Sequence, residues 1–270
     1  MTVDGLFPAL NIVFSAFFIV VGVYIYASLL WQIGARVPNS EPPPFRTFGV
    51  PEAIVGLVII SFFLVTLAAA PAHDVSRMRS RDLIASGSFT VGLLLALAGF
   101  LRLRRLDLGS LGGFSRIGFF RTVVTGAILM LAAYPLVILA DFFTQRLLRG
   151  PPQRQAIVEM FSESSTIEQR ILIIILAISL APLAEEFIFR FFLYGVAKRY
   201  FGRVIALVVT SLLFAAVHGH LPSFAPLLVL GSCLAVAYEW SGSILVPMTM
   251  HAMFNAVTLT ALAFPERFPS

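Results

Sequence analysis

The sequence predicts an all-α protein, a polytopic membrane bundle of about eight transmembrane helices. Only 12% of the 270 residues are charged, whereas soluble domains carry about 25%. Hydrophobic residues make up 59% of the chain and its mean hydropathy is +0.93. Uncharged stretches recur along the chain near the length of about 20 residues that crosses a bilayer. A disordered chain is excluded by this composition, and Cys233 alone excludes an internal disulfide framework.

The first half of the chain predicts four spans that carry no recognisable motif. The opening apolar run is too long for the core of a signal peptide, so we expect a retained span. A proline-rich connector at 36–51 separates it from the next span. We assign residues 1–164 to this N-terminal region, with spans at about 7–33, 52–70, 86–101 and 122–143.

The second half predicts four further spans after the long polar connector at 145–170. Ser165-Thr166-Ile167-Glu168 has the spacing of a capping box, which predicts a helix start there. We assign residues 165–264 to a catalytic helical core and 265–270 to a tail. The fifth span closes at the basic turn 198–203, and the remaining three lie at about 204–219, 224–240 and 244–264.

The positive charge does not predict a nucleic-acid partner, although the formal net charge is +5. The basic residues lie between apolar runs, where membrane proteins carry them in loops. Glu239 beside Trp240 is expected at the membrane interface, with its side chain reaching toward water. We therefore expect an integral multi-pass protein of a bacterial cell membrane, with the bilayer itself as a partner.

Polar side chains within the last four spans are the functional candidates. A charged residue at the centre of a membrane helix costs roughly 2.5–3.5 kcal/mol, so such residues are usually functional. Glu186 and Arg190 have the i,i+4 order that favours an ion pair. Glu185 projects about 100° away from Glu186, so the two acids are expected to face different neighbours. The full set is Glu185, Glu186, Arg190, His218, His251 and Asn255.

Their depths predict that these side chains meet in one site. The turn at 198–203 and the turn at 240–243 are expected on the same side of the membrane. At about 1.5 Å per residue, Glu185, His218 and Asn255 then lie roughly 18–21 Å from that side. His251 lies roughly 12 Å from it.

A carboxylate, two imidazoles and an amide at one level suit the hydrolysis of a peptide bond. A glutamate in apolar surroundings with His218 beside it can take a proton from water. His251 and Asn255 can donate hydrogen bonds to the oxyanion that forms. Equally, Glu185, His218 and His251 could bind zinc and a zinc-activated water.

Three motifs in these spans resemble those of the CAAX protease and bacteriocin-processing (CPBP) family of intramembrane proteases, which includes the type II CAAX prenyl endopeptidases. The resemblance covers about residues 171–260. Phe191 departs from the family pattern, because many members have glycine after the arginine. The motifs are EExxxR at Glu185-Glu186-Phe-Ile-Phe-Arg190, FxxxH at Phe214-Ala-Ala-Val-His218 and HxxxN at His251-Ala-Met-Phe-Asn255.

This resemblance implies an intramembrane endopeptidase that acts on a peptide or a membrane protein. It implies Glu185 as the catalytic base and His218 as its partner. His251 and Asn255 would stabilise the oxyanion, with Glu186, Arg190 and Phe214 in support. Both a zinc and a metal-free glutamate mechanism are compatible with the family, and the sequence favours the metal-free one because no HExxH pair is present.

Two other functions use the same residues. One is a proton-coupled transporter in which they relay protons, although the chain has no inverted repeat. The other is a non-proteolytic binding or immunity protein that keeps the same fold.

Overall fold

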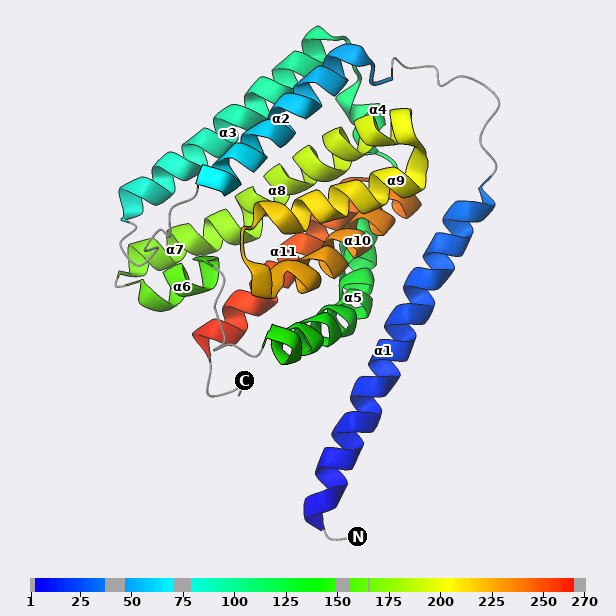
Figure 1. The fold of residues 1–270 in the computed structure, drawn as a ribbon, viewed down its shortest axis with the longest axis vertical. Coiled ribbons are helices and arrows are strands. Elements are labelled where there is room, and N and C mark those ends of the chain that lie inside the picture. The colour runs from blue at the N-terminus through cyan, green and yellow to red at the C-terminus, as the bar shows by residue number, and fades with distance from the viewer. Residues whose placement is uncertain (1–2, 37–46, 70–78, 149–155, 165, 265–270) are drawn as a thin grey trace.

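The computed structural model describes the chain except residues 1–2, 37–46, 70–78, 149–155, 165 and 265–270. Every regular element within the described ranges is helical, which confirms the predicted all-α class (Figure 1). Most of the proline-rich connector predicted at 36–51, and the whole of the predicted tail, lie outside the described residues.

The motif-free N-terminal region forms four long helices and two short ones. The short α4 is capped by Asp107, whose side chain accepts hydrogen bonds from the backbone N–H groups of Gly109 and Ser110. Hydrogen bonds from the Ser110 hydroxyl and from these backbone groups lower the pKa of Asp107. The helices are α1 (Val3–Ala35), α2 (Val50–Ala69), α3 (Ser80–Leu103), α4 (Leu108–Gly112), α5 (Phe119–Leu148) and α6 (Ala156–Glu163).

The C-terminal region begins close to the predicted helix start, although the capping residue is Thr166 and not the first residue of the predicted capping box. Thr166 caps α7 by accepting a hydrogen bond from the backbone N–H of Gln169. Two stretches, η2 and η3, are π-helical, with hydrogen bonds that span five residues. The order is α7 (Ile167–Ile175), η2 (Leu176–Leu180), α8 (Ala181–Glu185), η3 (Glu186–Leu193), α9 (Tyr194–Val217), the short η4 (Leu221–Ser223), α10 (Phe224–Ser241) and α11 (Leu245–Ala263).

Seven stretches of the described chain are long and apolar enough to cross a membrane, and one of them contains 51 residues, Ile167–Val217. A straight helix of that length would measure roughly 75 Å, more than twice the hydrocarbon thickness. Gly202 breaks it, with a φ of 79° and a ψ of 173° that no helix contains. The chain turns back there, within α9 (Tyr194–Val217), as Figure 1 shows. This stretch therefore supplies two crossings, in agreement with the predicted total of about eight.

The turn at 198–203 and the turn between α10 and α11 meet at one end of the bundle, as the depth argument required. Lys198 Nζ and Arg203 Nε lie 2.7 Å and 2.9 Å from the Glu239 carboxylate. The Tyr194 hydroxyl donates to the same group at 2.8 Å. The Glu239 side chain is only 8% exposed, so the prediction that it reaches toward water is wrong. Two neighbouring cations and a hydroxyl hold it in the protein instead.

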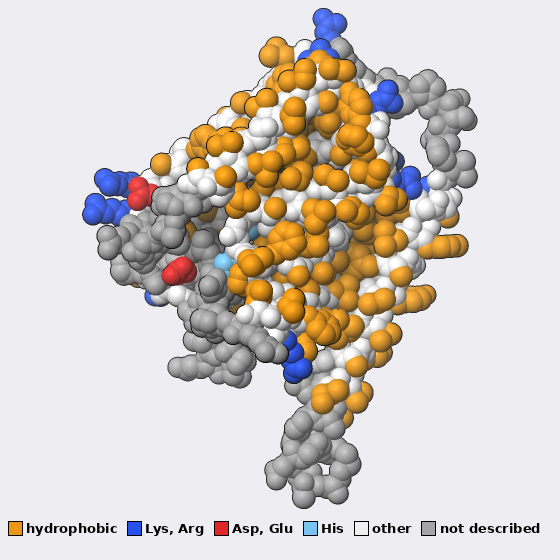
Figure 2. All heavy atoms as spheres, viewed as in Figure 1, with side chains coloured by type: hydrophobic (Ala, Val, Ile, Leu, Met, Phe, Trp, Pro, Cys, Tyr) orange, Lys and Arg blue, Asp and Glu red, His pale blue; other side chains and the backbone are white. Residues whose placement is uncertain are grey.

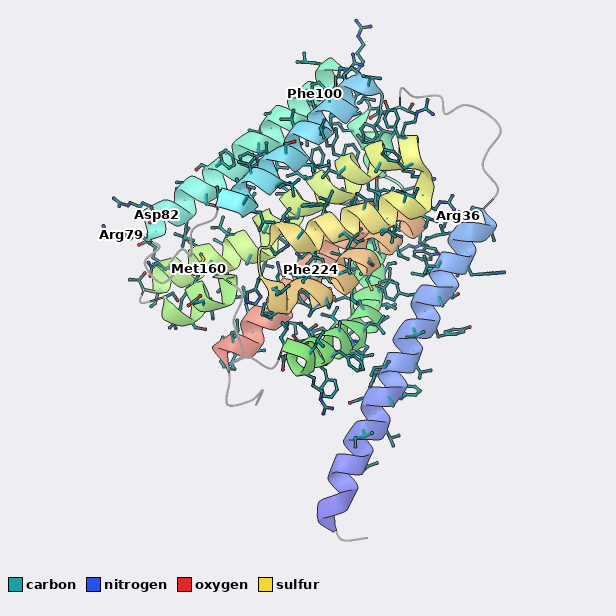
Figure 3. The ribbon with its side chains drawn as sticks, viewed as in Figure 1. Arg36, Arg79, Asp82, Phe100, Met160 and Phe224 are labelled. Carbon is teal, nitrogen blue, oxygen red and sulfur yellow. The ribbon has the colours of Figure 1, made fainter. Side chains whose placement is uncertain are left out.

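The C-terminal end of α1 is bound to this same end of the bundle. Arg36 donates to the backbone oxygens of Glu239 and Trp240, in the last turn of α10. Arg203 in turn donates to the carbonyl of Ile33. Figure 3 places Arg36 and Phe100 toward this end, and Arg79 and Met160 toward the other. We call it the basic end, defined by Arg36, Arg104, Arg116, Lys198 and Arg203.

The core lies around α10, which is the most enclosed span and packs against α1, α5, α9 and α11. In contrast, α1, α2 and α3 expose most of their apolar side chains. Figure 2 shows this hydrophobic surface as a broad band with few charges. Such a surface suits contact with lipid. The polar groups inside the bundle come instead from the helices α8, α9 and α11.

Candidate active site

The helix that carries the two acids changes its hydrogen-bonding pattern twice near them, where η2 ends at Leu180 and where η3 begins at Glu186. Pro182 lies three residues before Glu185 and has no N–H to donate, so the regular ladder cannot continue through it. η2 ends just before Pro182, and η3 begins at Glu186. Glu185 is thus the last residue of a five-residue α-helical turn between two π-helical stretches, a feature often found at functional sites.

Three of the predicted catalytic side chains come together. Glu185 Oε2 lies 3.9 Å from His218 Nε2 and 3.9 Å from His251 Nε2. His218 is at the C-terminal end of α9, and His251 is in the second turn of α11. The shared carboxylate oxygen is buried and has no hydrogen-bond partner among the described residues.

The other nitrogen of each imidazole is fixed by an acceptor. His218 Nδ1 lies 2.7 Å from the carbonyl oxygen of Phe214. His251 Nδ1 lies 2.9 Å from Glu186 Oε1. A carbonyl or carboxylate oxygen can only accept, so each Nδ1 carries the hydrogen. In the neutral ring Nε2 is then an acceptor, and both Nε2 atoms face Glu185.

Glu186 and Arg190 form the predicted ion pair inside the protein. Arg190 Nη1 donates to Glu186 Oε1 at 3.0 Å, and the two side chains are 1% and 0% exposed. Arg190 Nη2 donates to the Gly231 carbonyl on α10. Because Glu186 also binds His251, both acids contact the same imidazole. The two acids share His251, at opposite nitrogens of its ring, but their other neighbours differ as predicted, because Arg190 pairs with Glu186 and His218 lies near Glu185.

Phe214 is fully buried and packs against both sides of the site. Its ring centroid lies 5.0 Å from that of His218 and 5.8 Å from that of His251. The Arg190 guanidinium carbon lies 4.1 Å from the same centroid. A cation over an aromatic face is attracted by the ring, so Phe214 helps to hold both the pair and the imidazoles in place.

Asn255 has a different partner. It lies one turn beyond His251 on α11, and its side-chain nitrogen donates to the carbonyl oxygen of Ala177 at 2.8 Å. One turn corresponds to about 6 Å along the helix. His251, and not Asn255, therefore lies at the depth of Glu185. The sequence estimate placed Asn255 there because it counted residues from a turn and ignored the tilt of the helix.

The three candidate zinc ligands do not fit a zinc ion as they lie. Ligands of one tetrahedral zinc are about 3.3 Å apart, given metal–ligand distances near 2.0–2.1 Å. Here Glu185 Oε2 is 3.9 Å from each imidazole nitrogen. Within the described ranges, no group of three or more His, Cys, Asp or Glu side chains is arranged to hold a metal.

The site is partly open to the surface of the bundle. The side chains of Glu185 and His218 are each 27% exposed. His220, two residues after His218, bonds through Nδ1 to the Ser223 hydroxyl at 2.7 Å. Burial lowers the pKa of His220, which favours its neutral form.

Comparison with known families bears on these same helices. Residues 167–257 match the family model described as type II CAAX prenyl endopeptidase Rce1-like. The predicted resemblance is confirmed. This Rce1-like segment is about a third of the chain and contains Glu185, His218, His251 and Asn255. In general terms, this match supports a membrane endopeptidase of the CAAX type. No curated protein and no solved structure matches the chain.

Sequence reasoning missed two parts of this arrangement. It did not predict the cluster around Glu239, although Tyr194 and Lys198 are spaced i,i+4 on one helix face. It also did not predict the contact between Asn255 and Ala177. Pro182 was the available signal, since a proline inside an apolar span leaves carbonyls without donors.

Proposed function

We propose that the chain is an intramembrane endopeptidase in which Glu185 and two imidazoles hydrolyse a peptide bond. The observation that carries this proposal is the position of one unpartnered carboxylate oxygen, 3.9 Å from two imidazole nitrogens that both face it. Glu186 Oε2 is also buried without a partner among the described residues, but only Glu185 Oε2 faces two imidazole nitrogens and belongs to a partly exposed side chain, which favours a role in chemistry.

The separation between Glu185 and His218 suits one bridging water molecule. Two acceptors each about 2.8 Å from a water, and separated by about a right angle there, are about 4 Å apart. Such a water donates one hydrogen to Glu185 Oε2 and the other to His218 Nε2. Its lone pair then faces a substrate carbonyl carbon.

Hydrolysis then proceeds in two steps. The water oxygen bonds to the carbonyl carbon while Glu185 takes the proton, acting as general base. The oxyanion collapses, the C–N bond breaks, and Glu185 returns the proton to the leaving nitrogen. The products are a carboxylic acid and an amine, and Glu185 is again a carboxylate.

His251 and Asn255 are proposed to stabilise the oxyanion. His251 can donate from Nε2 when its ring is doubly protonated, with Glu186 accepting at Nδ1. Asn255 uses one side-chain hydrogen for Ala177 and keeps a second. Each such donor contributes about 10²–10³ to the rate in enzymes that use them.

The substrate class we propose is a peptide or a membrane-protein segment that reaches the site from the bilayer. Hydrophobic side chains surround the site, and its polar groups lie within the spans. We assign residues 165–264 to the catalytic core, residues 1–164 to supporting helices, and the protein to a bacterial cell membrane. The mechanism is proposed to use no metal.

The test is cleavage of membrane-peptide libraries by the protein in liposomes, with products identified by mass spectrometry. Glu185→Gln and His218→Ala are expected to abolish cleavage without loss of folded protein. Glu168→Gln is the matched control, because Glu168 is exposed on the first turn of the same helix. Cleavage that survives Glu185→Gln would contradict the mechanism. A protein with no cleavage of any peptide would instead be a binding member of the fold.

A further inference from the structure

The carbonyl of Ala177 lacks its usual donors within the helix. In an α-helix it would accept from residue 181, and in a π-helix from residue 182. The N–H of Ala181 donates to Leu176 instead. Residue 182 is proline, which has no N–H. The helix ladder therefore offers this carbonyl neither donor.

Asn255 supplies the missing hydrogen bond from another helix. Its side-chain nitrogen lies 2.8 Å from the Ala177 oxygen, and Ala177 is only 5% exposed. A backbone carbonyl without a partner in this environment would be strongly destabilising. The contact thus satisfies a group that Pro182 has left unpaired.

The same helix, α11, holds the acid-bearing helix at a second point. His251, one turn before Asn255, bonds through Nδ1 to Glu186. Ala177 and Glu186 lie on opposite sides of Pro182. The two bonds from α11 therefore span the proline break, and Glu185 lies between them in the sequence.

We propose that Asn255 is a positioning residue that holds the proline break of the acid-bearing helix. Together with the bond from His251 to Glu186, it fixes how the two sides of the break are oriented. This orientation keeps Glu185 at equal distance from both imidazoles. The catalytic consequence rests on the proposed function, whereas the hydrogen bond itself does not.

A double-mutant cycle between Asn255 and Pro182 tests the proposal. In Pro182→Ala, residue 182 regains an N–H and can serve the Ala177 carbonyl. Asn255→Ala is expected to lower the folding equilibrium constant at least about tenfold in the native background and less than about threefold in the Pro182→Ala background. Losses of equal size in both backgrounds would overturn the proposal.

Activity provides a readout that a purely structural contact would not move. Asn255→Ala is expected to reduce kcat with KM little changed, and Pro182→Ala is expected to restore part of that kcat. A residue acting only on the oxyanion would show the same loss in both backgrounds. If the stability cycle shows coupling but no variant cleaves any peptide, the positioning role of Asn255 is supported and the proposed function fails.

Hydrogen exchange keeps the proposal testable if Pro182→Ala does not fold. Asn255→Ala is expected to speed amide exchange in peptides covering 176–186 and to leave those covering 224–241 unchanged. Unchanged exchange at 176–186 would overturn the proposal.

Discussion

Glu185 and Glu186 are neighbours in the chain, but their surroundings give them opposite properties. Glu186 is fully buried, and one of its oxygens accepts from both Arg190 and His251. Glu185 is partly exposed and forms no ion pair with arginine or lysine, while its Oε2, like Glu186 Oε2, is buried without a partner among the described residues. We therefore propose that Glu186 supports the structure of the site and that Glu185 is the reacting acid.

Substitution of the two acids is expected to separate stability from activity. Glu186→Gln leaves the Arg190 guanidinium buried without its counter-charge, which we expect to cost about 3–5 kcal/mol of folding stability. Glu185→Gln removes no ion pair with arginine or lysine and is expected to change stability by less than about 1 kcal/mol. Thermal unfolding in detergent measures both. A larger loss for Glu185→Gln would contradict this division.

The spacing of the three candidate zinc ligands, Glu185, His218 and His251, predicts that activity does not depend on zinc. Because Glu185 lies 3.9 Å from each imidazole nitrogen, cleavage is expected to continue unchanged after chelation. Elemental analysis of the purified protein is expected to find less than one metal per chain. One zinc per chain, together with activity that is lost on chelation and restored by zinc, would contradict this prediction. The three side chains would then have to move closer together to bind the ion.

At the scale of elements, α1 is held by its C-terminal half. Gly22 is buried, and a Cβ added there would lie 2.4 Å from the Ala132 carbonyl oxygen on α5. Residues 12–18 of the same helix are all exposed. Small residues allow membrane helices this close approach, so Gly22 fixes the contact between α1 and α5.

Replacing that glycine is expected to separate the two helices. Gly22→Val places a side chain where a backbone oxygen already lies, and we expect a loss of about 1–3 kcal/mol of stability. Gly34→Val is the matched control in the same helix, because nothing lies within 4 Å of an added Cβ there. A fall in Tm for Gly22→Val alone would support the packing, and equal changes in both would refute it.

The sequence predicted the elements better than the contacts between them. Uncharged runs and their lengths located the spans, because the bilayer imposes that length directly. They could not reveal the π-helical stretches around Glu185, which depend on how α11 and α10 pack against that helix. Nor could they show that Asn255 pairs with Ala177, because side-chain partners depend on helix tilt and rotation.

Charged residues near the basic end illustrate the same limit. Glu239 looked like an interface residue because Trp240 follows it. Its true partners, Tyr194, Lys198 and Arg203, come from a helix some 40 residues earlier. Motifs did better, since the three family patterns marked Glu185, His218 and His251, and these side chains meet.

At the scale of the whole molecule, the break at Gly202 decides the number of membrane crossings. With two crossings in Ile167–Val217, the described helices are expected to cross the membrane eight times, an even number that predicts both termini on one side. Tags appended to the two termini are expected to be equally accessible to a protease on the same side of sealed vesicles. Tags on opposite sides would mean that this stretch crosses only once.

Glu185 is proposed to activate water for direct attack on a peptide bond. Isotope transfer in a single turnover, in H₂¹⁸O and with enzyme in excess over peptide, tests it most directly. We expect one ¹⁸O atom in the new carboxyl group and no covalent enzyme adduct. With Glu185→Gln, we expect no labelled product while the protein stays folded. A trapped acyl-enzyme, or labelled product at an undiminished rate from Glu185→Gln, would contradict the account.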